Sequence, residues 1–524
     1  MIIKQTEFGP VEVTTVPLPG GLGSDVSGTY TSSGRILVSV RQPEKGEDWY
    51  RVFTIGDDGA DICEVFDGCI PKKKGANGVR WMCFADNRRV LLGDYVLECA
   101  PDLDHCTEAR LTDVIFPDVV SQIPGLFMRW SEPIVSPDCE HICFSSLTGS
   151  GAFNFLGKLV RTGDAYVIED VCIVSAVNSV EPDANNPGWY RLSPHRGGEV
   201  KQFVRGGRGL TLAGGGKSIS ESSLQMLDSN EVYFITDTLG YEETAILSPD
   251  ERYAVCMSPR FSPGTDLGVL GVVPLSGDML TRSRYLNVLY QYSIAGVRFQ
   301  RPGNIGPALI DVERSMNEGR DYTGVDLSDP EKRWVYYSPI SWYPGSTKAL
   351  WNERTRLDAG PVQCRLRRCR LLDVPPSAPV PAGRTPDREE IPYALPPESA
   401  LKIEHPKFPV RVKGICGCVE ALERADGWLE TRYDRYSEDG KTFYEGFLRV
   451  KTPANMFQPG ETLILADITV TGGHTGRMQL QLVMQADSRF QIHLDRSLDQ
   501  NGLPKSRGFA EYDGLRRDVA DIEP

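Results

Sequence analysis

Arginine, aromatic and glutamate residues are concentrated in six short segments spread along the chain. These segments are Arg80-Trp81, Arg129-Trp130-Ser131-Glu132, Trp189-Tyr190-Arg191, Tyr241-Glu242-Glu243, Arg298 and Trp334-Val335-Tyr336-Tyr337. An arginine fork binds carboxylate or phosphate, and an aromatic ring stacks on a planar group. If the fold gathers these segments, they predict a pocket for a small anionic or aromatic molecule. The predicted binding residues are Arg80, Arg129, Trp130, Arg191, Arg298 and Arg260.

Glutamate and tyrosine residues of the same segments supply the candidate catalytic groups. Glu132 and Glu242, with Glu243 as a further candidate, can act as acid or base once a neighbouring charge shifts their pKa. Tyr190 and Tyr241 can donate a proton or orient a carbonyl. The structural alternative is that the aromatic rings pack between sheets and the arginines pair with these glutamates. The sequence leaves both interpretations open.

Several motifs with known chemistry are incomplete. The run from Ala213 to Ser218 resembles a phosphate loop, but its first glycine would stand where the chain has Thr211. No G-x-S-x-G elbow occurs, and Cys416-Gly-Cys418 lacks a second ligand pair at zinc spacing. We therefore predict no metal site, no cofactor and no serine-hydrolase domain.

A repeated turn indicates the elements that would position these residues. Apolar runs flank Ser248-Pro249-Asp250, where proline and aspartate favour a tight reversal between antiparallel strands. Full or degenerate copies are Ser32-Ser33-Gly34, Ala85-Asp86-Asn87, Ser136-Pro137-Asp138, Ser193-Pro194-His195, Arg301-Pro302-Gly303 and Tyr343-Pro344-Gly345. Seven copies at a period of about fifty residues predict seven small sheets packed radially. The strand from Pro10 to Val16 would complete the last sheet and close the ring.

The Ser-Pro-Asp turn after an innermost strand resembles the TolB-like, or PD40, branch of the WD40-like β-propellers. This resemblance covers roughly residues 10 to 372 and implies a ligand site at the mouth of the central channel. Two features of related families are missing from this sequence. The hydrolase domain of prolyl-oligopeptidase-like relatives has no counterpart here, nor does the histidine cluster of oligogalacturonate lyases.

Two segments of different composition follow the repeats. Ten prolines between Pro375 and Pro409 prevent a strand ladder and predict an extended linker over the surface. Segments in which apolar and polar residues alternate follow the linker, and Gly-containing turns separate them. The predicted fold is all-β: a seven-bladed β-propeller over residues 1–373, a proline-rich linker over 374–409, and a small C-terminal antiparallel β-sandwich or barrel domain over 410–524.

Composition narrows the partners. A net charge of -14 argues against a nucleic-acid partner, and the longest apolar run is too short to span a bilayer. The absence of a secretory pattern at the start favours a cytoplasmic protein. We expect a small-molecule-binding propeller, and any catalysis at its site would be non-redox lyase, isomerase, cyclase or hydrolase chemistry. The alternative is a non-enzymatic protein-interaction scaffold. The sequence does not indicate an oligomeric state.

Overall fold

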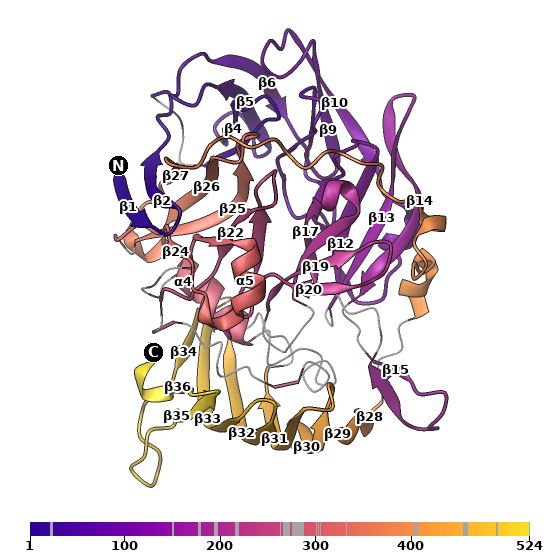
Figure 1. The fold of residues 1–524 in the computed structure, drawn as a ribbon, viewed down its shortest axis with the longest axis vertical. Helices are drawn as coiled ribbons and strands as arrows, with labels where there is room; N and C mark the ends of the chain where they lie inside the picture. The colour runs from indigo at the N-terminus through magenta and orange to yellow at the C-terminus, as the bar shows by residue number, and fades with distance from the viewer. Residues whose placement is uncertain are drawn as a thin grey trace.

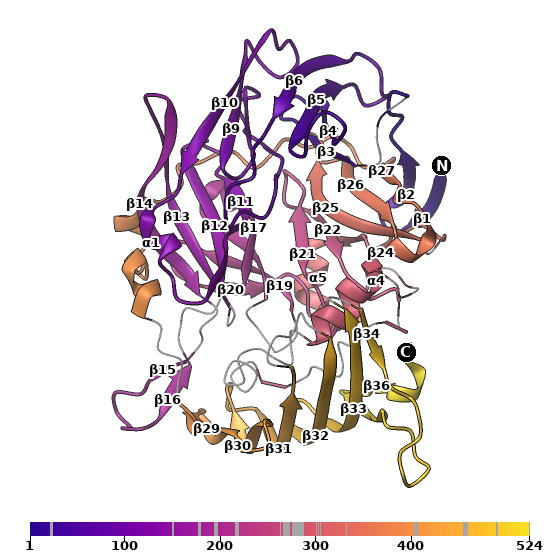
Figure 2. The same cartoon turned by 180° about the vertical axis from the view of Figure 1, so that it is seen from behind.

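The computed structural model shows an all-β chain in which small antiparallel sheets stand around a common axis, which is a β-propeller (Figures 1 and 2). It describes all residues except 21, 23–24, 149–150, 177–179, 193–197, 215–219, 263, 266–272, 275–287, 300, 302, 304, 332, 403–406, 454–458, 489–490 and 523–524. No helix within the described ranges combines the length and apolarity that crossing a membrane requires.

The described residues form six blades, numbered here in chain order. Blade 1 is β3 (Val26–Tyr30), β4 (Ile36–Arg41), β5 (Trp49–Ile55) and β6 (Cys63–Cys69); blade 2 is β7 (Met82–Cys83), β8 (Arg89–Leu91), β9 (Tyr95–Ala100) and β10 (Glu108–Ile115); blade 3 is β11 (Leu126–Val135), β12 (His141–Thr148), β13 (Gly151–Thr162) and β14 (Ala165–Ala176). Blade 4 is β17 (Glu199–Val204), β18 (Gly209–Ala213), β19 (Ser222–Met226) and β20 (Val232–Phe234); blade 5 is β21 (Thr244–Leu247), β22 (Tyr253–Met257), β23 (Ala308–Asp311) and β24 (Val325–Asp326). Blade 6 is β25 (Trp334–Trp342), β26 (Lys348–Thr355), β27 (Cys364–Leu371), β2 (Gly9–Thr15) and β1 (Ile2–Thr6).

The prediction of seven blades is therefore wrong for the described chain. Contacts close the ring through β3 and β7, β8 and β11, β11 and β17, β17 and β21, β21 and β25, and back from β25 to β3. Residues 193–197, which include one predicted turn, lie outside the described residues. The strand after Gly303, β23, is the third strand of blade 5, since it pairs with β22 and β24. A proline-glycine turn marks any reversal, so it does not by itself mark the start of a blade.

The Ser-Pro-Asp turns are held by their own side chains. The Ser248 hydroxyl donates to Asp250 Oδ1 at 2.6 Å and accepts from the Tyr253 backbone N–H at 3.0 Å. In blade 3 the His141 N–H donates to the Ser136 hydroxyl at 2.9 Å. These bonds satisfy backbone groups at the reversal, which explains why the tripeptide is a dependable turn signal.

The predicted closure of the ring by the first residues is confirmed. β2 pairs antiparallel with β27, with Val11 opposite Leu371 and Val13 opposite Cys369. Val11 and Val13 are fully buried. The last blade is thus completed from the opposite end of the chain, which removes one exposed sheet edge from the ring.

The proline-rich linker crosses the face of the propeller where each inner strand turns into the second strand, called the turn face here. Backbone N–H groups of Ser377, Val380 and Gly383 donate to carbonyl oxygens of Gly345, Pro249 and Gly206, in blades 6, 5 and 4. The donors are three residues apart, which is one turn of a polyproline II helix, about 9 Å long. The predicted surface linker is therefore a strap that bonds to successive blades.

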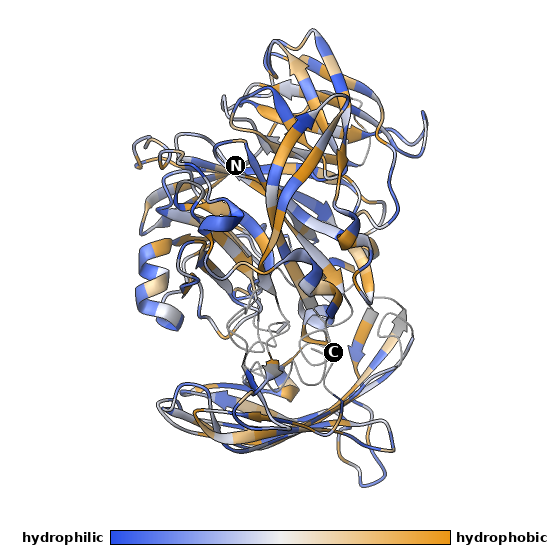
Figure 3. Cartoon of the chain, turned by 90° about the vertical axis from the view of Figure 1, so that its right-hand side faces the viewer, coloured by the Kyte–Doolittle hydropathy of each residue, from blue (hydrophilic) through white to orange (hydrophobic). Residues whose placement is uncertain are grey.

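The C-terminal residues form one open sheet instead of the predicted sandwich or barrel. Its strands are β28 (Val410–Lys413), β29 (Cys416–Glu423), β30 (Leu429–Ser437), β31 (Thr442–Lys451), β32 (Gly460–Gly472), β33 (Gly476–Ser488), β34 (Gln491–Leu494), β35 (Arg507–Tyr512) and β36 (Leu515–Asp518). Figure 3 shows this sheet as a curved single layer below the propeller.

Two contacts explain why the C-terminal sheet does not close on itself. Its apolar face packs against Leu239, Leu289 and Tyr292, which belong to connections between propeller strands. A hairpin inserted before blade 4, β15 (Val180–Pro182) and β16 (Tyr190–Leu192), extends the sheet because β16 pairs in parallel with β28. These connections lie on the face opposite the turn face, called the loop face here. The propeller itself thus supplies the second layer of this core.

Candidate functional site

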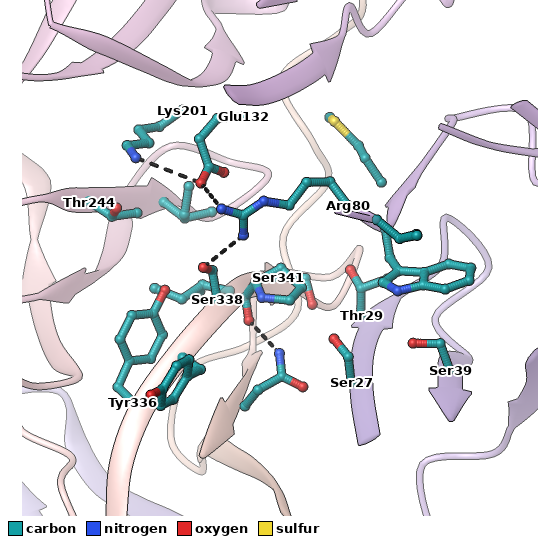
Figure 4. Close-up of a pocket in the computed structure, with 18 of the residues that line it drawn as sticks. Ser27, Thr29, Ser39, Arg80, Glu132, Lys201, Thr244, Tyr336, Ser338 and Ser341 are labelled. Atoms are coloured by element: carbon teal, nitrogen blue, oxygen red, sulfur yellow. Dashed lines mark hydrogen bonds and ion pairs between the residues drawn. The ribbon is translucent and has the colours of Figure 1, made fainter. Parts of the chain in front are cut away.

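A cavity of about 570 Å³ lies on the propeller axis and is lined by residues of all six inner strands (Figure 4). The charged residues of its lining are Asp25, Arg41, Arg80, Glu132, Lys201, Glu243, Arg298 and Arg354. Five of these side chains are basic and three are acidic, although the whole chain is acidic. The axis therefore gathers positive charge that the composition does not reveal.

Arg80 occupies the centre of the cavity. Its Nη2 lies 2.6 Å from Oε1 of Glu132, and its Nη1 donates to the Ser338 hydroxyl at 3.0 Å (Figure 4). The Nε atom of Arg80 is buried and has no hydrogen-bond partner among the described residues. Arg80 therefore links blades 2, 3 and 6 and retains one donor for another acceptor.

Bulges in three inner strands direct side chains into the cavity. The pairing of β11, β17 and β25 is interrupted next to Glu132, Lys201 and Ser338 respectively. Glu132 also has a φ of 46°, a left-handed conformation that a glutamate rarely adopts. Bulges and strained residues are enriched next to functional sites because they redirect individual side chains. Their grouping around one cavity is typical of a binding site.

Lys201 is held as a buried ammonium group. Its side chain is 3 % exposed, and Nζ lies 2.7 Å from Oε2 of Glu199 and 4.0 Å from Oε1 of Glu132. Burial lowers the pKa of Lys201, but the charges of Glu199, Glu132 and Glu243 outweigh it and raise the pKa above its usual value. Lys201 is therefore a fixed positive charge and not an amine nucleophile, which requires a neutral nitrogen.

Glu243 and Arg298 are the least paired charges of the lining. Oε2 of Glu243 and Nε of Arg298 are both buried without a hydrogen-bond partner among the described residues. Burial raises the pKa of Glu243, although Lys201 and Arg298 oppose the shift. The Arg298 guanidinium lies 5.0 Å from the centre of the Tyr337 ring. Arg298 belongs to α4 (Gly296–Phe299), in the long connection between β22 and β23.

Hydroxyl and aromatic side chains line the rest of the cavity. Ser27, Thr29 and Ser39 come from blade 1, and Ser338 and Ser341 come from blade 6 (Figure 4). The rings of Tyr50 and Trp81 are in edge contact, with centroids 5.9 Å apart. Hydroxyl groups both donate and accept hydrogen bonds, so this wall can bind either donor or acceptor groups of a polar ligand.

Of the ten residues predicted from the sequence, the structure brings Arg80, Glu132 and Arg298 together in the cavity. Glu242 and Arg260 instead form a buried ion pair, with Nη2 of Arg260 3.0 Å from Oε2 of Glu242. Their side chains are 0 % and 5 % exposed. This pair therefore matches the alternative interpretation of the sequence, in which arginines pair with these glutamates in a structural role. Tyr241 is buried with its ring 5.7 Å from that of Tyr290, and it does not line the cavity.

The other four predicted residues lie elsewhere. Arg129 pairs with Asp94 and lies over the Phe116 ring, while Trp130 is fully buried in the core of blades 2 and 3. Tyr190 and Arg191 are in β16, which belongs to the C-terminal sheet. Arg129 and Trp130, close in sequence to the cavity residue Glu132, therefore serve the packing of blades 2 and 3, whereas Tyr190 and Arg191 belong to the C-terminal sheet.

Lys201 and Glu199 belong to the site, although no motif in the sequence singles them out. They alternate in an apolar strand, so they share one face of it, and that was the available signal. The predicted turn at Ser193-Pro194-His195 would make it the second strand of a blade, whereas it is the inner strand of blade 4. For metals, no group of three or more His, Cys, Asp or Glu residues in the described ranges has a suitable arrangement.

No family model matches this chain, and no curated protein matches it. Solved structures do show similarity. TolB from Acinetobacter baumannii is 12% identical, with a TM-score of 0.30 over 65% of this chain and 64% of that chain. Oligogalacturonate lyase from Vibrio parahaemolyticus is 8% identical, with a TM-score of 0.35 over 69% of this chain and 97% of that chain. Similarities this weak carry no argument about ligand or reaction, so the propeller assignment rests on the sheet topology.

Proposed function

We propose that this chain is a ligand-binding β-propeller whose axial cavity takes a small anionic molecule. The observation that carries the proposal is the convergence of Arg80, Lys201 and Arg298, from distant parts of the chain, on one cavity. Two of these, Arg80 and Arg298, have a buried Nε donor without a partner among the described residues. Buried donors without partners are costly, and an anionic ligand would satisfy them.

The cavity is also suited to a ligand of defined size. About 570 Å³ lies within the range of small-molecule sites, which combine a few placed polar groups with aromatic walls. Of the lyase, isomerase, cyclase and hydrolase reactions, those that need only proton transfer fit the lining, because the Glu243 carboxyl group can exchange a proton. Binding is the primary function that we propose, and catalysis would be built on it.

Thermal stabilisation by ligands tests this function. The probes are a panel of aromatic acids, sugar acids and phosphates, added to the full chain and to the variant Arg298→Gln. We expect at least one class of acid to raise the Tm, and Arg298→Gln to weaken its affinity about tenfold or more, since a hydrogen bond to a charged group contributes about 1.5–3 kcal/mol. Arg191→Ala is the matched control, because Arg191 is in β16 and outside the cavity. A flat response to every acid would contradict the proposal.

A protein-interaction scaffold is the second candidate, and one observation favours it. The edge strand β20 exposes three consecutive apolar or aromatic residues, Val232, Tyr233 and Phe234, with exposed fractions of 37%, 43% and 41%. Exposed apolar edge strands are sites of strand addition. Loss of self-association or partner binding in Phe234→Ser, together with no acid binding, would favour the scaffold.

A further inference from the structure

Ion pairing among the charged residues that line the axial cavity leaves Arg41, Arg298 and Glu243 without an oppositely charged partner in the described chain. Arg80 is paired with Glu132, Lys201 with Glu199, and Arg354 with Asp25 at 2.7 Å. Arg41 donates to the backbone oxygen of Glu47. Arg298 and Glu243 have no ion pair among the described residues, although both line the same cavity.

Arg298 and Glu243 are close enough for their charges to influence each other. Besides burial, the charges of Lys201 and Arg298 lower the pKa of Glu243, and Tyr290 and Glu243 raise the pKa of Arg298. Arg298 is instead placed between the Tyr337 ring and the sulfur of Met257, which its Nη2 approaches to 3.2 Å. A guanidinium and a carboxyl group therefore face one cavity without satisfying each other.

We propose that the cavity recognises a zwitterionic α-amino carboxylate, with its carboxylate at Arg298 and its ammonium at Glu243. This inference rests on the proposed function and names the ligand class of the same site. A ligand of this class carries the inverse arrangement of the two protein charges, so both buried groups gain a charged partner at once. An acid without the ammonium group would satisfy only Arg298. The side chain of the amino acid would lie against the hydroxyl and aromatic walls.

Matched sets of ligands test the proposal without any variant. One set is L-phenylalanine, 3-phenylpropionate and phenethylamine, and the other is L-serine, 3-hydroxypropionate and ethanolamine. Each set presents one side chain with both charges, with the carboxylate alone, or with the ammonium alone. By isothermal titration calorimetry on the full chain, we expect the amino acid of at least one set to bind at least tenfold more tightly than both analogues.

Two variants then assign the charges. Glu243→Gln is expected to abolish the preference for the amino acid over the acid, and Arg298→Gln to abolish its preference over the amine. Arg191→Ala, outside the cavity, is expected to change neither preference. The Tm of each variant without ligand shows whether it folds, and the wild-type comparison holds even where a variant does not.

The outcomes separate this inference from the proposed function. If 3-phenylpropionate or other acids bind as tightly as the amino acids, the ammonium site is refuted while anion binding stands. If the amino acids do not bind but sugar acids or phosphates do, the inference is again refuted alone. If no acid of any class binds, the proposed function and the inference both fail.

Discussion

Charged side chains near the propeller axis differ in how completely they are paired, and this separates structural from functional residues. Glu242 has its Oε1 within 2.5 Å of the Ser258 hydroxyl and 2.9 Å of the Thr238 hydroxyl, besides its pair with Arg260. Glu243, the next residue, has a carboxylate oxygen without such a partner in the described chain. The two glutamates directly precede β21, and their side chains differ in surroundings: Glu242 pairs with Arg260 in the blade interior, whereas Glu243 lines the cavity.

We predict that Glu242 acts in stability. Glu242→Ala leaves the Arg260 guanidinium buried without its partner, and breaking a buried pair costs about 3–5 kcal/mol. Denaturant unfolding measures this loss. Glu318→Ala, which removes an exposed partner of Arg314 in α5 (Val312–Glu318), is the control and should change stability little. Stability equal to wild type in Glu242→Ala would contradict the structural role.

At the scale of elements, the strap is the segment whose attachment depends on a titrating group. His141 is buried in blade 3, with Nε2 3.0 Å from Oδ1 of Asp387 and Nδ1 3.8 Å from Oδ2 of Asp138. Lys158 Nζ lies 3.1 Å from the same oxygen of Asp387, and Arg384 Nη1 lies 3.1 Å from its Oδ2. Asp387 begins the short helical turn Arg388–Glu390 of the strap.

We predict that the strap loosens as the pH rises. Burial lowers the pKa of His141, but the hydrogen bonds and charges of Asp138 and Asp387 outweigh it, so the pKa is raised. A raised pKa in the folded state means that the stabilisation is complete below the unfolded value, about 6.5, and is lost as pH rises through the folded value. Asp138 and Asp387 have lowered pKa values and stay charged over this window.

Hydrogen exchange of residues 377–395 between pH 6 and pH 9, corrected for intrinsic rates, measures this change. We expect protection to fall with rising pH in the wild type. In His141→Gln the change with pH should disappear. His474→Gln, on the far C-terminal sheet, should behave as the wild type. The same pH dependence in His141→Gln would show that another group controls the strap.

At the scale of the whole molecule, the ring is held between two coverings. The strap crosses the turn face over blades 6 to 3, and its Pro379 and Val380 line a second cavity of about 480 Å³ at that end of the channel. The C-terminal sheet covers loops of blades 4 and 5 on the opposite face. Arg301 joins the two parts there, since its buried guanidinium donates to the backbone oxygens of Tyr292 and Ile492.

We predict that ring closure depends on β2 and not on β1. Deleting residues 1–16 removes Val11 and Val13, whose full burial contributes about 3 kcal/mol or more together, and exposes the edge of β27. Denaturant unfolding and light scattering should show lower stability and aggregation. Deleting residues 1–7 removes only the outer strand and should have a much smaller effect. A peptide of residues 1–16 added to the larger deletion should restore part of the stability.

Local patterns in the sequence are enough to predict the strands, the turns and the ring closure. Alternating apolar residues and Ser-Pro-Asp turns are local signals, because each reversal is stabilised by bonds within five or six residues, as between Ser248 and Tyr253. Proline density is local as well, since it excludes a ladder wherever it occurs. These signals predicted the antiparallel sheets, the closing strand and the extended strap.

The number of blades and the residues that form the site depend on contacts that exist only in the folded ring. Blade count depends on which strand faces the axis, and a turn motif does not specify that. Glu132, Lys201 and Ser338 reach the cavity through bulges, which shift a side chain without leaving a signal in the local pattern. Arg298 comes from a connection between strands, and the C-terminal sheet remains open because propeller loops cover its apolar face. Each of these outcomes depends on contacts between residues far apart in sequence, where local propensity carries no information.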